Sequence, residues 1–333
     1  QYNLNVQQQI GSANMLAVGY TGSRGINQTS FSDFNAPVPV YDGVSLMMPE
    51  GAQRFNPLFE EMAYTSTNSN SWYSAMTVSF ARRATAGLQT QLAYTWARSI
   101  SISDTAQRAE YSGGGAAQLL SAHLPPVAKS LSGYHIGQAL NFNYSYVLPF
   151  GRGMSGVAGR ALGGWQLTGI LRAQSGQPFT LSRTTPNAIT AIQSAGTRPN
   201  RDLSVPGDKI TSGTTAGCTG VAAGRKLGTP DLWFDPCAYS LPGTRQLGNV
   251  GVNTVLSARW MTWDMGLTKD TSLTERVGLQ FRWEVFNLMN RANFANPSSG
   301  LFNAGGARVA TAGRISSTSS ENRQMQLSLK LMF

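Results

Sequence analysis

Hydrophobic and polar residues alternate along most of this chain, and the pattern is clearest at its C-terminal end. Residues 322–333 read NRQMQLSLKLMF, in which every second residue from Met325 to Phe333 is apolar. Successive side chains of a β-strand point to opposite faces of its sheet. This segment is therefore predicted to be a strand with one apolar face and one polar face.

The same period-two pattern recurs in eight further segments of the sequence. They are residues 2–10, 14–22, 71–83, 87–98, 139–150, 164–174, 259–268 and 276–288. Each is close to the ~9–11 residues that a tilted strand needs to cross a bilayer. The pattern therefore predicts an all-β chain of about nine strands.

The connections between these segments alternate between short and long. The short ones are residues 11–14, 84–87, 151–164 and 269–275, and the long ones are 24–70, 99–133, 176–253 and 289–321. An outer-membrane barrel has short periplasmic turns and long extracellular loops, so its connections alternate in this way. We therefore predict a transmembrane antiparallel β-barrel with long extracellular loops, located in the bacterial outer membrane and in contact with its lipid.

Aromatic residues are expected at both ends of the strands. Trp72, Trp96 and Trp260 lie next to long loops, whereas Trp165 and Phe333 lie next to a short turn or the chain end. Two bands of rings at the membrane interfaces are typical of such barrels, and we predict that these residues form an aromatic girdle. The alternative is a soluble β-sandwich that packs its aromatic rings between two sheets.

The opposite face of the strands carries polar and charged side chains. Arg172, Asp264, Gln280, Arg282 and Glu284 occupy alternate positions in neighbouring segments. Opposite charges on adjacent strands form pairs across a sheet. We therefore predict that these five residues face a polar lumen.

Composition and motifs argue against several other classes of function. The net charge is +10, but the arginines are scattered rather than gathered in a stripe, so no nucleic-acid partner is expected. The chain has two histidines and no G-x-S-x-G motif, so neither an enzyme nor a bound cofactor is expected.

The two cysteines, Cys218 and Cys237, fall within one of the long loops. No histidine is close to them in sequence, which disfavours a zinc site. A disulfide that staples the loop in an oxidising compartment is one interpretation, and two free buried thiols are the alternative.

Several motifs in their order along the chain resemble a known family. They are YVLPFGRG (146–153), GGWQLTGILRAQSGQPFTL (163–181), RPN (198–200), WFDPCAY (233–239), LQFRWEVFNLMNRANFANP (279–297) and RQMQLSLKLMF (323–333). Together they resemble the barrel of TonB-dependent receptors, specifically the Oar-like group with a carboxypeptidase-regulatory-like domain. The family pattern FNLFNHxNF appears here as FNLMNRANF, with Met289 and Arg291 as the departures.

The resemblance implies more than this chain contains. It implies a barrel of about 22 strands closed by a plug domain. Residues 1–333 are accordingly expected to be the C-terminal part of the barrel, without the plug. The implied function is energised uptake of a bulky ligand, with the TonB system acting through the plug and the barrel-assembly machinery reading the last strand. The alternatives are a surface structural or adhesion protein without transport and a small self-closed barrel.

Overall fold

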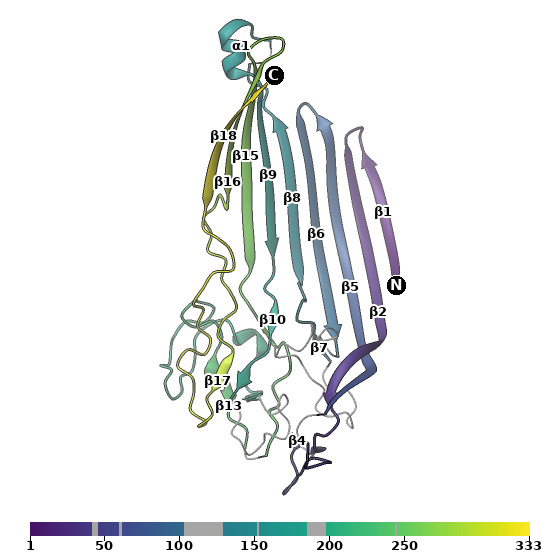
Figure 1. Ribbon diagram of the computed structural model, residues 1–333, viewed down its shortest axis with the longest axis vertical. Helices are drawn as coiled ribbons and strands as arrows, with labels where there is room; N and C mark the ends of the chain where they lie inside the picture. The colour runs from purple at the N-terminus through teal and green to yellow at the C-terminus, as the bar shows by residue number, and fades with distance from the viewer. Residues whose placement is uncertain (42–45, 60–61, 103–128, 152, 185–197, 244) are drawn as a thin grey trace.

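A computed structural model describes residues 1–41, 46–59, 62–102, 129–151, 153–184, 198–243 and 245–333. Nine long strands form one sheet in chain order, with every neighbouring pair antiparallel (Figure 1). They are β1 (Tyr2–Ile10), β2 (Asn14–Asp33), β5 (Ala63–Thr85), β6 (Leu88–Ser101), β8 (Gln138–Val147), β9 (Trp165–Gln174), β15 (Trp260–Ser272), β16 (Gly278–Phe286) and β18 (Gln324–Met332). The all-β antiparallel prediction is confirmed.

The connections sort by length to the two ends of the sheet. Residues 11–13, 86–87, 148–164 and 273–277 connect strands at one end, which is also where β18 finishes (Figure 1). Residues 34–62, 102–137, 175–259 and 287–323 connect strands at the other end. The β5–β6 turn is the tightest, with positive φ at Ala86 and Gly87 (53° and 84°), as the right-handed twist of a hairpin favours.

The β2–β5 hairpin is longer than the sequence pattern predicted. Its pairing continues to Asp33 opposite Ala63, with register shifts near Gln28. A strand of 20 residues spans about 66 Å, roughly twice the ~30 Å hydrocarbon thickness. This hairpin is therefore much longer than a strand needs to be to cross a bilayer, and its extra length lies on the long-loop side.

Strand register places the apolar residues of neighbouring strands side by side. Leu92, Phe142, Leu171 and Trp263 form one continuous row across β6, β8, β9 and β15. The adjacent row, on the other face, consists of Gln91, Asn143, Ile170 and Asp264. A slip of one residue in any strand would exchange its two faces. The register of the strands thus gives the sheet one mainly apolar face and one mainly polar face.

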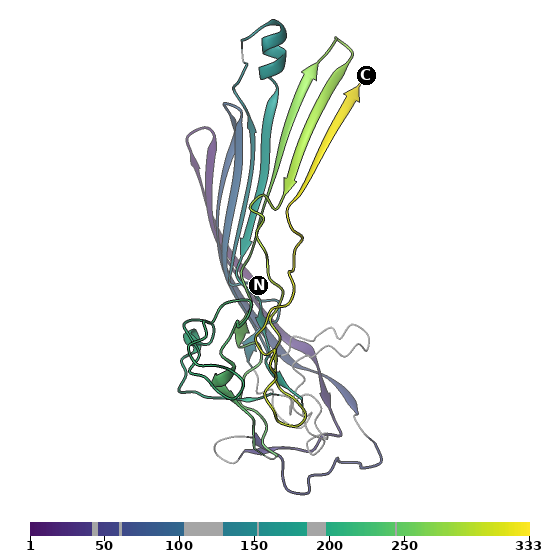
Figure 2. The same ribbon diagram turned by 90° about the vertical axis from the view of Figure 1, so that its left-hand side faces the viewer.

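The sheet forms an open, curved wall with β1 and β18 at its two edges (Figure 2). Within the described residues, β1 pairs only with β2, and β18 pairs only with β16. Every residue of both edge strands is exposed. The wall does not close on itself.

Two of the long connections fold together into a compact unit, which we call the cap. It comprises the described residues of 175–259 and 287–323. Its short elements are β10 (Pro178–Phe179), β11 (Ser182–Arg183), β12 (Asn200–Arg201), η3 (Gly207–Lys209), η4 (Pro236–Ala238), β13 (Tyr239–Ser240), β14 (Val255–Leu256) and β17 (Gly300–Phe302). Strand β11 pairs with β17 in parallel and so joins the two connections.

The main hydrophobic core of the described chain lies in the cap, not in the sheet. Phe234, Leu181 and Leu301 are fully buried there. The remaining core residues are Phe179, Ile210, Ala238, Tyr239, Val250, Val255, Phe302 and Ala312. The cap is therefore a folded subdomain, and most apolar side chains of the sheet lie outside this core.

The remaining short elements are β3 (Val40–Tyr41), β4 (Leu46–Met47), β7 (Ser130–Leu131) and α1 (Gly156–Leu162). Strands β3 and β4 form a small hairpin, and β7 adds to β6. No helix in the described parts of the chain has the length and apolar character needed to span a membrane.

Candidate functional site

The polar face of the sheet carries two ion pairs. Arg172 Nη2 of β9 lies 3.6 Å from Asp264 Oδ2 of β15, and Arg282 Nη1 lies 3.6 Å from Glu284 Oε1 on the same strand, β16. All four side chains are partly exposed, and such pairs contribute only about 0–1 kcal/mol each. Their role is to give the face a charge pattern rather than to hold the sheet together.

Further hydrogen bonds connect this face laterally. Gln280 Nε2 donates to Asp270 Oδ1 at 2.8 Å, and Gln326 Nε2 donates to Glu284 Oε2. Asp264 also accepts from the backbone N–H of Asn287 at 2.9 Å through its second oxygen. The five residues proposed for the lumen thus share one polar face, and exposure of that face to a lumen stays a prediction.

The aromatic residues proposed for the girdle do not all share one face. By ladder register, Trp72, Trp96 and Trp165 stand on the apolar face, and Phe333 follows the end of β18 on an exposed chain end. Trp260 stands on the polar face, where the Arg172 guanidinium lies 5.8 Å from its ring centroid. The period of two places Trp260 with Thr262 and Asp264, so its ring does not belong to a band on the apolar face.

Two of the rings on the apolar face also contact cations. The Lys129 Nζ lies 4.0 Å and the Arg24 guanidinium 5.8 Å from the Trp72 ring centroid. Lys269 Nζ lies 5.1 Å from the ring centroid of Trp165. Rings with cations beside them suit a membrane interface, where apolar and wet surroundings meet.

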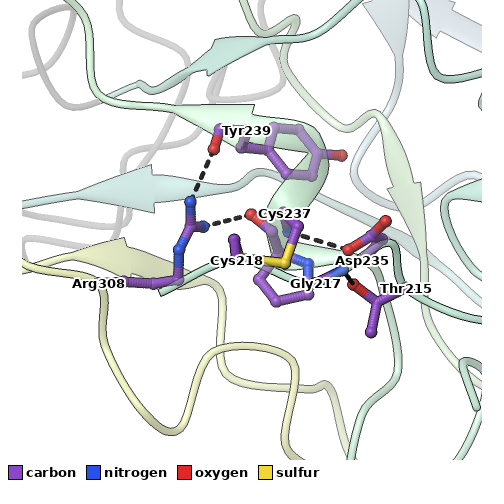
Figure 3. The surroundings of a disulfide bond; sticks show 8 residues. Thr215, Gly217, Cys218, Asp235, Cys237, Tyr239 and Arg308 are labelled. Carbon is purple, nitrogen blue, oxygen red and sulfur yellow. Dashed lines mark hydrogen bonds between the residues drawn. A yellow bond between two sulfur atoms is a disulfide. The ribbon is translucent and has the colours of Figure 1, made fainter. Parts of the chain in front are cut away.

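Cys218 and Cys237 form a disulfide with their Cα atoms 5.5 Å apart (Figure 3). Asp235 Oδ1 accepts from the backbone N–H of Cys237 at 2.9 Å, which fixes the start of η4. The sequence contains two cysteines, so no thiol remains free. The bond staples the longest connection of the chain onto the core of the cap.

Arg308 joins residues 287–323 to the segment that follows the disulfide. Its guanidinium donates to the carbonyl oxygens of Pro236 and of Tyr239, the latter at 3.0 Å (Figure 3). Burial lowers the pKa of Arg308 and raises the pKa of the Tyr239 phenol to about 12. Both groups are thus held in an interior in which charge is costly, which is the environment of a rigid subdomain.

Two asparagines join the cap to the sheet, and the sequence analysis did not single them out. Asn293, fully buried, accepts from Met261 N–H at 2.8 Å and donates to Met261 O at 2.9 Å and to Ser320 Oγ at 3.0 Å. Asn287, with φ of 50°, donates its backbone N–H to Asp264 of β15 and its side-chain amide to the carbonyl oxygens of Arg291 and Glu321 in the cap. Both lie within FNLMNRANF, the motif that was read only as a family likeness.

His135 lies in the connection between β6 and β8, next to the end of β6. Its Nδ1 accepts from the backbone N–H of Ser99 at 3.1 Å, and the residue is buried. Burial, with a smaller contribution from Arg98, lowers the pKa of His135 below its usual range. Its geometry is that of a structural histidine, and no cluster of three metal-binding side chains occurs in the described part of the chain.

Comparison with solved structures finds large outer-membrane proteins. The outer membrane transporter YddB from Escherichia coli matches with 11% identity and a TM-score of 0.45 over 99% of this chain and 32% of that chain. The FrpB iron transporter from Neisseria meningitidis (F3-3 variant) matches with 7% identity and a TM-score of 0.38 over 99% and 30%. The chain thus spans about a third of the length of these proteins.

No curated protein matches the sequence. A family model, the outer membrane beta barrel domain, matches residues 1–326, which is nearly the whole chain. The observed sheet, with one continuous apolar face and its connections sorted by length, has the architecture of that family. The chain belongs to the outer membrane beta-barrel domain family, and its place is the bacterial outer membrane.

Proposed function

We propose that this chain forms part of the wall and the extracellular mouth of a larger receptor barrel that takes up a bulky ligand. One observation carries the proposal: within the described residues, the nine-stranded wall leaves the outer edges of β1 and β18 unpaired. Unpaired edges are not tolerated in a bilayer core, where each backbone group needs a partner. We therefore infer that further strands adjoin β1 and β18.

Strand direction also argues against closure of this wall on its own. In an antiparallel sheet of nine strands the first and last strands run in the same direction, so β1 and β18 would meet as a parallel pair. Single-chain bacterial barrels have even numbers of antiparallel strands, which avoids such a pair. We therefore propose residues 1–333 as the C-terminal part of a barrel of the plugged size, about 22 strands.

The cap suits the mouth of such a barrel. Its disulfide, buried core and asparagine contacts hold two connections in one shape at the long-loop end. A preorganised surface loses little entropy when it binds. The ligand would meet the cap first, then the polar face with Arg172, Asp264, Gln280, Arg282 and Glu284. Energy would arrive through a plug and the TonB system, as the Oar-like resemblance implies.

The uptake experiment compares the parent bacterium with a strain that lacks this gene, with and without a protonophore. Loss of a solute from the medium is followed by mass spectrometry. The proposal expects a bulky solute that only the parent consumes, and only with an intact proton-motive force. Gene-dependent consumption that survives the protonophore would refute energised uptake. If no solute depends on the gene but attachment to surfaces does, the adhesion alternative replaces it.

The barrel-size experiment uses the whole protein in outer membranes. One cysteine replaces Asn5 in β1 and another replaces Ser328 in β18, both on the polar face. A short bismaleimide joins the two thiols only if the two edge strands are neighbours. The larger barrel predicts no intramolecular product, whereas efficient cross-linking would show that the wall closes alone. A matched pair on the neighbouring strands β16 and β18, Arg282→Cys with Ser328→Cys, serves as the positive control.

A further inference from the structure

The connection between β8 and β9 was expected to be a simple turn, but it contains the short helix α1. At about 100° per residue, Val157, Ala158, Ala161 and Leu162 lie within an arc of about 140°. All four are exposed, with Val157 at 83% and Leu162 at 48%. None of the residues of α1 is buried. The helix is therefore amphipathic, with its apolar side turned outward.

Glycines pack the connection closely around this helix. A Cβ on Gly159 would clash with the carbonyl oxygen of Met154, and a Cβ on Gly151 would clash with the backbone of Gly163. The backbone of the connection is thus packed against itself, but the apolar side chains of α1 stay uncovered. A helix facing water would be expected to turn its apolar side inward. An apolar side that the described protein leaves uncovered indicates an apolar environment outside the helix.

Two residues of the apolar sheet face fix the position of α1. Trp165 Nε1 donates to the carbonyl oxygen of Ala161 at 3.3 Å. Lys269 Nζ donates to the carbonyl oxygens of Arg160 and Gly163 at 2.8 and 2.6 Å. Trp165 and Lys269 are ladder partners on the apolar face. The last turn of α1 is therefore fastened to the rim of the surface that faces lipid.

We propose that α1 is an interfacial anchor that lies in the periplasmic leaflet of the outer membrane. Its partner is a phospholipid surface, with Val157 and Leu162 among the acyl chains and the Arg160 guanidinium at the headgroup phosphates. The argument is continuity: the exposed apolar side of α1 adjoins the lipid-facing side of β9 and β15 through Trp165 and Lys269. Short amphipathic helices with a cationic side bind membranes in this way. The inference is independent of the proposed uptake function.

The same contacts explain why a lysine stands on the apolar face. Lys269 occupies a position in register with Phe281 and Trp165 near the rim of the apolar face, where its ammonium still needs hydrogen-bond acceptors. Its charge is instead placed on the carbonyl end of α1, where the helix dipole favours a cation. Lys269 thus satisfies carbonyl groups at the C-terminal end of α1, and these groups in turn solvate its ammonium.

The test uses the whole protein folded into vesicles of phosphatidylethanolamine and phosphatidylglycerol. Val157→Cys and Leu162→Cys are each labelled with an environment-sensitive fluorophore, and Arg160→Cys is the matched control on the other side of α1. Quenching is measured with spin-labelled phospholipids and with aqueous iodide. Val157 is more exposed than Leu162, so its replacement is the less disturbing of the two to folding.

The proposal expects that spin-labelled lipid quenches residues 157 and 162 at least about twice as strongly as residue 160. It expects that iodide quenches residue 160 more strongly than the other two. Equal and strong iodide quenching at all three sites would overturn it, because the helix would then project into the periplasm. Protection of residues 157 and 162 from both quenchers would also overturn it, because the helix would then be covered by protein.

Discussion

Replacing Phe142 by arginine tests the assignment of the two sheet faces at a place where the expected effect is largest. Phe142 lies in the middle of β8, flanked in the ladder by Leu92 and Leu171, with its ring 5.5 Å from that of Tyr144. Its neighbour Asn143 points to the opposite face, between Gln91 and Ile170. The two substitutions introduce the same side chain at adjacent positions of one interior strand, so they differ in facing and not in backbone context.

The magnitude follows from the depth of Phe142. The ten residues of β8 cover about 26 Å along the membrane normal at a tilt of ~40°, which matches the ~25 Å apolar band of a barrel. Phe142 therefore lies near the bilayer midplane, where an arginine on the lipid face costs about 2–4 kcal/mol. At Asn143 the arginine would be solvated, and we expect a change within about 0.5 kcal/mol.

The assay is guanidinium unfolding of the whole protein in phospholipid vesicles, followed by tryptophan fluorescence. Phe142→Leu is the control for loss of the ring without added charge. Equal destabilisation by the two arginines, or a larger effect at Asn143, would refute the facing. The depth dependence gives an internal check. Phe281, beside Lys269 and Trp165 near the short-turn end, should tolerate arginine at a cost of only about 0–1 kcal/mol.

Three further predictions concern the cap and its attachment. Cys218→Ser removes the disulfide, which joins two residues that are 19 apart in sequence. The loss should destabilise the cap by about 3 kcal/mol. Unchanged resistance of the cap to limited proteolysis would contradict this. Asn293→Ala removes three buried hydrogen bonds and should cost about 2–3 kcal/mol in the same unfolding assay, whereas a neutral effect would show that the contacts to Met261 are dispensable. Burial lowers the pKa of His135, so the folded state favours the neutral imidazole. The stability that this residue contributes is therefore complete above pH ~6.5, the usual pKa of histidine, and declines as the pH falls below that value. The protection factor of the Ser99 amide, which is its exchange rate corrected for the slower intrinsic exchange in acid, should fall accordingly. A protection factor that does not change with pH would disprove the coupling.

The long strands were predictable because each has one face toward lipid. Membrane facing forces strict alternation in segments such as 139–150 and 322–333, and alternation is the signal that a sequence reader detects. The order of short and long connections followed from the same segments. Neither prediction required knowledge of contacts distant in sequence.

Other features left no such local signal. In sequence, residues 23–30 of β2 and 64–71 of β5 are mostly Ser, Thr, Asn, Gln and Gly, so they show no alternation and looked like loop. The cap depends on pairings between β11 and β17, more than a hundred residues apart in sequence, and each partner is too short to show a period. Trp260 lies at the predicted end of its strand. It directly precedes Met261, which is on the apolar face, so the period of two already placed Trp260 on the polar face. That signal was present in the sequence and was not used.

The most direct test of the two-faced wall is a spin-label scan of residues 261–268 in β15, one cysteine at a time in the whole protein in lipid vesicles. Collisions with dissolved oxygen report contact with lipid, and collisions with a water-soluble nickel chelate report contact with water. The account predicts a two-residue period with oxygen contact at Met261, Trp263, Met265 and Leu267 and nickel contact at Asp264, Gly266 and Thr268. Oxygen and nickel profiles without this alternation, or odd positions shielded from both reagents in a dry protein interior, would contradict it.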